Sequence, residues 1–121
     1  MKIAFTVAGT DMTAAMDPRF GRCSGFLIYN LDNDTFAINA NRSRDAAHGA
    51  GIQSAESMVR SGVHAVITGH CGPKAFQVLR AAGIKVFATT APNVTDALAL
   101  YRQGKLTEIT TPQSQGRGRR A

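Results

Sequence analysis

The chain has few cysteines and no long apolar run. The first argues against a disulfide-stabilised or zinc-stabilised protein, and the second argues against a membrane-spanning protein. Its 121 residues include two cysteines, Cys23 and Cys71, without Cys-x-x-Cys spacing. This usage argues against a disulfide framework and a structural zinc site, because a chain of this length can bury a core without either. No apolar stretch approaches the roughly 18 residues of a membrane span, and no leader with a cleavage site is visible. We therefore expect one cytoplasmic domain.

Basic residues outnumber acidic ones, but half of the excess lies close to the C-terminus. The formal net charge is +6, and Arg117, Arg119 and Arg120 carry half of it in a run, 113–120, that has no apolar residue to bury. We expect a domain over 1–110 and a disordered basic tail over 111–121. The tail lacks the interleaved aromatic residues of single-strand binders, so nucleic acid is not the expected partner.

Hydrophobic periodicity predicts three strands followed by alternating helices and strands. The predicted strands are Lys2–Ala8, Gly25–Leu31, Thr35–Ala40, Val63–Thr68 and Ile84–Ala88. The residues predicted to stop the three helices are Gly62, Gly83 and Gly104, and Pro73 and Asn93 mark two of the starts. The order β-β-β-α-β-α-β-α requires both antiparallel and parallel pairing. The predicted fold is α/β, with a mixed five-stranded sheet and helices covering it.

Three loops are predicted to meet at one edge of this sheet. If the first strand runs up, the strand before each of the loops 9–24, 41–49 and 69–72 also runs up. Each loop therefore leaves the edge that holds the carboxyl ends of the parallel strands, which is the usual ligand position in open α/β sheets.

The three loops contain most of the residues that could bind a ligand. The candidate binding residues are Met16, Arg19, Phe20, Arg22, Cys23, His48, Gly49, Gly51, Ile52, His70, Cys71 and Gly72. The two arginines suit a polyanion, Gly72 opens a helix whose amides favour an anion, and Met16, Phe20 or Ile52 could form an apolar wall. Possible direct metal ligands are Cys71, His70 and His48.

Each candidate also has a purely structural interpretation. Free cysteine is often buried, so Cys23 and Cys71 could belong to the core. The glycines could serve only to cap helices, and His48 could simply begin one. These alternatives remain open at the level of the sequence.

Several ordered segments resemble the family of dinitrogenase iron–molybdenum cofactor-binding domains. They include Asp17-Pro18-Arg19-Phe20-Gly21-Arg22, Gly49-x-Gly51-Ile52, Val66-Ile67-Thr68-Gly69 with Gly72-Pro73, and Gly83-Ile84-Lys85-Val86, within Met1 to about Leu106. The resemblance implies a ribonuclease-H-like fold and a carrier or accessory protein for metal clusters. The chain most resembles a small stand-alone member of the family, and this resemblance implies a molybdenum–copper sulfide cluster held without covalent attachment, with an iron–molybdenum-type cluster as the alternative.

Catalytic functions fit the sequence less well than binding. A two-metal nuclease needs carboxylates on its central strands, and Ile3–Val7 and Ala65–Thr68 contain none. A nucleotide or nucleic-acid-binding module is the second hypothesis. A thiol enzyme with Cys71 as nucleophile is the third, although no orienting carboxylate is specified. We expect a cluster-binding protein that is not an enzyme.

Overall fold

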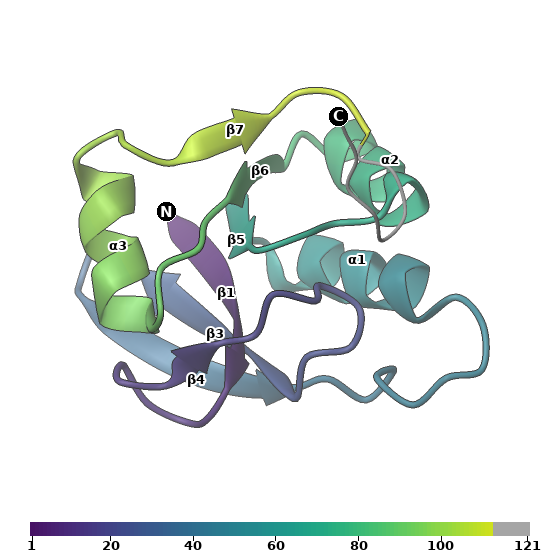
Figure 1. Ribbon diagram of the computed structural model, residues 1–121, viewed down its shortest axis with the longest axis horizontal. Coiled ribbons are helices and arrows are strands. Elements are labelled where there is room, and N and C mark those ends of the chain that lie inside the picture. The colour runs from purple at the N-terminus through teal and green to yellow at the C-terminus, as the bar shows by residue number, and fades with distance from the viewer. Residues whose placement is uncertain (113–121) are drawn as a thin grey trace.

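The computed structural model describes residues 1–112, in which three helices accompany a mixed sheet (Figure 1). The strands are β1 (Lys2–Ala8), β2 (Ala15–Met16), β3 (Gly25–Asn30), β4 (Thr35–Ala40), β5 (Ala65–Thr68), β6 (Lys85–Ala88) and β7 (Thr107–Ile109). The helices are α1 (Ala50–Ser61), α2 (Pro73–Ala81) and α3 (Val94–Arg102). Residues 113–121 of the expected basic tail lie outside this description.

The sheet order is β4-β3-β1-β5-β6-β7, with β2 paired to β1. Strands β1, β5 and β6 are mutually parallel, whereas β3 is antiparallel to both β1 and β4. The predicted strand directions are therefore confirmed. The predicted count of five strands is wrong, because β2 and β7 add two short antiparallel strands to the described sheet. Both are too short to show a clear alternation in the sequence.

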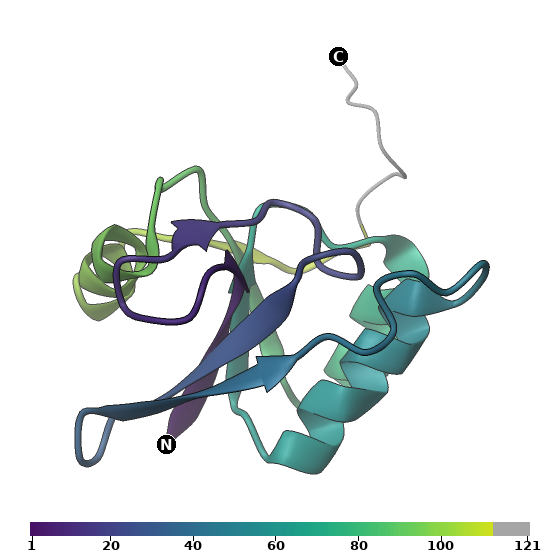
Figure 2. The same cartoon turned by 90° about the horizontal axis from the view of Figure 1, so that it is seen from below.

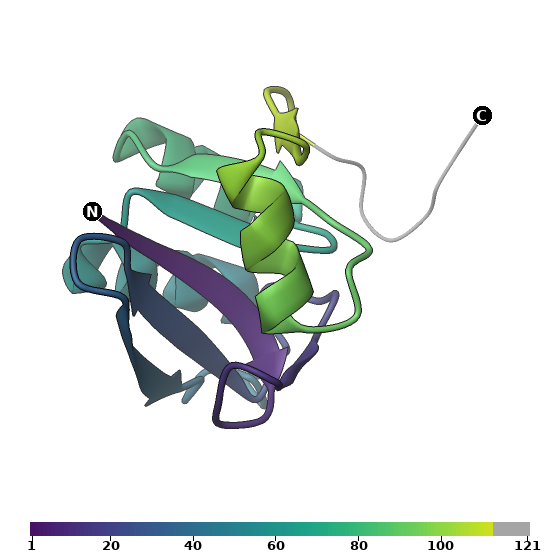
Figure 3. The same cartoon turned by 90° about the vertical axis from the view of Figure 1, so that its left-hand side faces the viewer.

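Helices cover both faces of the sheet. Figures 2 and 3 show α3 on one side, and α1 and α2 next to each other on the other side. Alternate side chains of each strand face opposite sides of a sheet. On β1, Ala4 belongs to the cluster that α1 and α2 cover, whereas Ile3 and Phe5 belong to the cluster that α3 covers. The period-two pattern of the sequence thus builds two cores.

Glycines end the helices as predicted. Gly62 is the C-cap of α1 with φ 73°, and Gly83 and Gly104 have φ 78° and 69° just beyond α2 and α3. These left-handed conformations are ones that glycine adopts without strain. No helix within residues 1–112 has both the length and the apolar character needed to cross a membrane.

Candidate functional site

The three predicted loops converge on one cavity of about 540 Å³ at the amino ends of α1 and α2. Its lining residues are Gly21, Arg22, Ala47, His48, Gly49, Ala50, Gly51, Ile52, His70, Gly72, Lys74 and Ala75. This volume lies in the range of small-ligand sites. The shared edge inferred from strand directions is therefore confirmed.

Backbone hydrogen bonds join the loop after β1 to the loop after β5. The Phe20 N–H donates to the His70 carbonyl at 3.2 Å, and the His70 N–H donates to the Pro18 carbonyl at 2.7 Å. Arg19 and His70 form an isolated parallel bridge at the same place. The backbones of the two loops are thus held side by side.

Close glycine contacts allow the loops to approach each other. A Cβ on Gly21 would lie 2.8 Å from both the Cα and the N of Gly51, at the start of α1. A Cβ on Gly69 would lie 2.6 Å from the Cβ of Pro18. Real Cβ atoms do not approach other atoms this closely, so larger residues at these positions would push the loops apart.

Asn41 is a buried polar residue that connects the loops, and the sequence analysis missed it. Its Nδ2 donates to the carbonyls of Gly21 at 3.1 Å and Cys23 at 3.0 Å, and its Oδ1 accepts from Ser54 Oγ at 3.2 Å. Its side chain therefore fixes the first loop to α1. A polar residue directly after an exposed edge strand gives no local sign of burial, so the sequence held little signal for this role.

The two helices at the cavity begin differently from α3. Asn93 caps α3 by accepting from the Asp96 N–H at 2.9 Å, and Asp96 places a carboxylate in its first turn. The caps of α1 and α2 are Gly49 and Gly72, which make no side-chain cap hydrogen bond, and neither helix has an acidic residue in its first turn. Helix amides and the helix dipole at such ends favour an anion.

Basic side chains line the cavity beside these helix ends. Arg22 and Lys74 carry positive charge, His48 and His70 are imidazoles, and no carboxylate is among the described lining residues. Lys74 was not predicted, although its place directly after Pro73 at the start of α2 could have indicated it. The cavity therefore has the electrostatic character of an anion site.

Arg19, a predicted anion ligand, does not line the cavity. Its Nε and Nη2 donate to the two carboxylate oxygens of Asp17, at 3.1 and 3.0 Å. Burial alone would raise the pKa of Asp17, but the hydrogen bonds from Arg19 outweigh it and hold the pKa below its usual value. We therefore assign Arg19 to the structure of the first loop.

Arg22 does line the cavity, but its guanidinium contacts the chain itself. Nη1 donates to the carbonyls of Arg44 at 2.6 Å and Ala46 at 2.8 Å, both in the loop that precedes α1. Arg22 thus lies at the cavity and connects two loops, and its role as a ligand of the cofactor stays a prediction.

The predicted apolar wall is smaller than expected. Ile52 lines the cavity. Phe20 is 2% exposed within the core that α1 and α2 cover, and Met16 packs against the core that α3 covers. Neither Met16 nor Phe20 lines the cavity.

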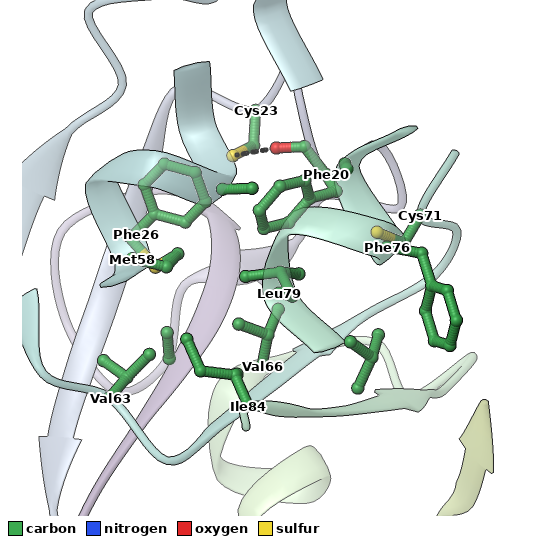
Figure 4. Close-up of a cluster of buried hydrophobic side chains, with 14 of the residues drawn as sticks. Phe20, Cys23, Phe26, Met58, Val63, Val66, Cys71, Phe76, Leu79 and Ile84 are labelled. Carbon is green, nitrogen blue, oxygen red and sulfur yellow. Dashed lines mark hydrogen bonds between the residues drawn. The ribbon is translucent and has the colours of Figure 1, made fainter. Parts of the chain in front are cut away.

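Both cysteines are buried in the core beneath the loops. Each is 0% exposed, in the same apolar cluster as Phe20 and Phe26, and Figure 4 shows the Cys23 thiol beside the Phe20 carbonyl, to which it donates at 3.4 Å. Burial, and then the Asp17 carboxylate, raise the pKa of the Cys23 thiol to about 11. Burial raises the pKa of the Cys71 thiol to about 12. Both thiols are therefore protonated near neutral pH.

This arrangement does not suit a conventional metal centre. Within residues 1–112 no group of three or more His, Cys, Asp or Glu side chains could hold a metal ion. Metal binding needs thiolates rather than thiols, and a thiol whose pKa is near 12 gives up its proton only at a high free-energy cost. Of the possible ligands, His48 and His70 line the cavity, whereas Cys71 does not.

Comparisons with known proteins identify the family of this chain. The family model for the dinitrogenase iron–molybdenum cofactor matches residues 1–104. The chain is 36% identical to the apo form of the orange protein from Desulfovibrio gigas, with a TM-score of 0.89 and coverage of 93% and 96% of the two chains. It is 31% identical to a proposed NifB protein of the DUF35 family from Thermotoga, with a TM-score of 0.83 and coverage of 95% and 98%.

A relative in Methanocaldococcus jannaschii, the uncharacterized protein MJ0580, is 33% identical over 109 residues, which are 88% of this chain and 89% of that one. Together with the family model, this similarity extends over both cores and all three loops of the cavity. The chain therefore belongs to the dinitrogenase iron–molybdenum cofactor family.

Proposed function

We propose that this protein binds an anionic metal–sulfur cluster, containing molybdenum and in the favoured form also copper, in the cavity between its three loops. The cluster is held without covalent bonds to the chain. An iron–molybdenum-type cluster is the alternative cargo. The observation that carries the proposal is the meeting of two glycine-capped helix ends with Arg22 and Lys74 at one cavity of about 540 Å³.

Family membership supports a cluster as the ligand, and the structure supports retention by charge and backbone amides. A thiometallate is a soft polyanion that brings its own sulfide, so it requires no thiolate from the protein. The first-turn amides of α1 and α2 can donate to its outer atoms, and Lys74 supplies positive charge. Ile52 and the neighbouring alanines give one side of the cavity an apolar surface.

The same observations support a binding protein over a thiol enzyme. A nucleophilic cysteine needs a depressed pKa and access to substrate, whereas Cys23 and Cys71 are buried and have raised pKa values. We further propose that the protein is not an enzyme, that it is located in the cytoplasm and that its fold is of the ribonuclease-H-like class.

Reconstitution with tetrathiomolybdate and copper(I) tests the proposal. The protein is desalted, and its visible absorption and its molybdenum and copper contents are measured. We expect Lys74→Gln to lower affinity by about fivefold and to reduce its salt dependence, as loss of an exposed charge contact worth about 1 kcal/mol would. The matched control is Lys105→Gln, which removes the same charge after α3, outside the cavity lining.

The cysteine variants separate this site from a direct metal–thiolate site. We expect Cys23→Ala and Cys71→Ala to keep the metal content and spectrum of the unmodified protein. A folded Cys71→Ala protein without metal would contradict the proposal. Binding of ATP or phosphate at this cavity, with no retention of the cluster, would support the nucleotide-binding hypothesis instead.

A further inference from the structure

We infer that Arg22 is a positioning residue that latches the loop before α1 onto the rim of the cavity. This loop, residues 41–49, joins β4 to α1 and contains His48, which lines the cavity. Arg22 holds it through two carbonyls, those of Arg44 and Ala46. The consequence for binding rests on the function proposed above, whereas the latch itself does not.

The backbone on both sides of Arg22 is held in place by contacts with Asn41 and with the start of α1. The side chain of Asn41 donates to the carbonyls of Gly21 and Cys23, which flank Arg22 in the chain. Gly21 also lies against Gly51 at the start of α1 without room for a Cβ. The backbone at Arg22 is therefore held on both sides, so its guanidinium can restrain a loop that is more exposed than this backbone.

The contacts within the loop are local. The Ala46 N–H donates to the Ser43 carbonyl at 3.0 Å, and the Ser43 N–H donates to Asn41 Oδ1 at 3.1 Å. Such turns shape the segment but do not fix it to the rest of the molecule. The two hydrogen bonds from Arg22 fix the middle of the loop to the first loop, and the charge of Arg44 also acts on Asp17 of that first loop.

The position of the loop decides what the cavity presents to a ligand. Ala47, His48 and Gly49 follow directly after the latched carbonyls, and all three line the cavity. If the loop moves away, the imidazole of His48 and the glycine cap of α1 move with it. Arg22 thus acts on binding through the loop as well as through its own charge.

Lysine at position 22 separates the two effects. Lysine keeps the positive charge, but its ammonium is a flexible point donor and does not reproduce the planar guanidinium that reaches two carbonyls. A purely electrostatic role for Arg22 requires Arg22→Lys to behave like the unmodified protein. The latch requires Arg22→Lys to release the loop as Arg22→Ala does, although its charge is kept.

The first test uses the protein without any ligand. Amide hydrogen exchange at Ala46 is measured by NMR in the unmodified protein, Arg22→Lys, Arg22→Ala and the control Lys74→Gln, and thermal unfolding checks that each variant is folded. We expect both Arg22 variants to exchange about tenfold faster, the change that loss of two hydrogen bonds produces in a local opening equilibrium. Lys74→Gln should exchange like the unmodified protein, because Lys74 contributes charge to the cavity from α2. Unchanged exchange in Arg22→Ala overturns the latch.

The second test adds tetrathiomolybdate and copper(I) over a range of salt concentrations. We expect Arg22→Lys to lose affinity while it keeps the salt dependence of the unmodified protein, and Arg22→Ala to lose more affinity because it also lacks the charge. An Arg22→Lys protein that binds the cluster like the unmodified protein overturns the link between the loop and binding. If the unmodified protein retains no cluster, the proposed function fails, and the exchange measurement still decides whether Arg22 holds the loop.

Discussion

The cavity and the core beneath it are built from the same loops but have opposite chemistry. In the first loop Gly21 and Arg22 line the cavity, whereas Phe20 and Cys23 on either side are buried. After β5, His70 lines the cavity and the next residue, Cys71, is buried. Cationic side chains and helix ends therefore face the cavity, and the thiols face apolar side chains.

The helix ends at the cavity also differ from the third helix end in whether a side chain occupies their first amides. The helix ends at the cavity have glycine caps, whereas the end of α3 is closed by Asn93 and Asp96. A capping side chain stabilises a helix by occupying the amides that an anion would use. The ends of α1 and α2 thus lack the stabilisation that a capping side chain gives, and their first amides are left for other partners.

The largest expected effect comes from a change that breaks the close contact between the first loop and the start of α1 at the cavity. Gly21→Ala places a Cβ where only 2.8 Å separates it from Gly51. We expect the free energy of unfolding to fall by about 1–3 kcal/mol, measured by urea denaturation, and cluster binding to be lost as α1 is displaced. Gly72→Ala is the control, since a Cβ there meets nothing within 4 Å. Equal stability of the two variants would contradict the close-contact explanation.

The next prediction concerns the core alone: the free energy of unfolding should fall at alkaline pH because of the two buried thiols. The folded-state pKa values of about 11 for Cys23 and about 12 for Cys71 lie above the ordinary thiol value of 9.0, so folding favours the protonated thiols. Their contribution to stability is complete below the unfolded pKa and is lost as the pH rises through that value toward the folded ones. We expect a loss of about 1 kcal/mol per thiol for each pH unit above about 9.

The double variant Cys23→Ala/Cys71→Ala isolates this contribution, because other groups also titrate at high pH. The free energy of unfolding, measured by denaturant titration from pH 8 upward, should fall less steeply in the double variant than in the unmodified protein. Identical slopes would show that the thiols titrate alike in the folded and unfolded chains.

The smallest expected effect comes from giving α2 the kind of side-chain cap that α3 has. Gly72→Asp supplies α2 with a preferred cap and a negative charge, as Asn93 and Asp96 do for α3. We expect the free energy of unfolding to rise by about 0.5–1 kcal/mol, while affinity for the tetrathiomolybdate–copper cluster falls about tenfold. Opposite signs for stability and binding are the expected result. A variant that gains stability and keeps full affinity would show that the α2 amides do not contact the ligand.

Most of the scaffold follows from local patterns in the sequence. Alternation over Lys2–Ala8 and over Thr35–Ala40 predicted β1 and β4 with their bounds, and Pro73 marked the first residue of α2. These patterns are reliable because an alternating run or a helix start constrains its own neighbours whatever the rest of the chain does. The strands β2 and β7 were missed because pairing with β1 and β6 makes them strands, not their own composition.

The sequence also determined which loops share an edge, because strand order and direction follow from the connections between elements. Only the tertiary structure decided which side chain of each loop faces the cavity. Loop residues have no fixed period, so His70 and Cys71, or Phe20 and Arg22, differ in burial through contacts with distant segments. For the same reason the side chains of Arg22 and Asn41 took their partners from distant parts of the folded chain, and no spacing within the sequence indicates those partners.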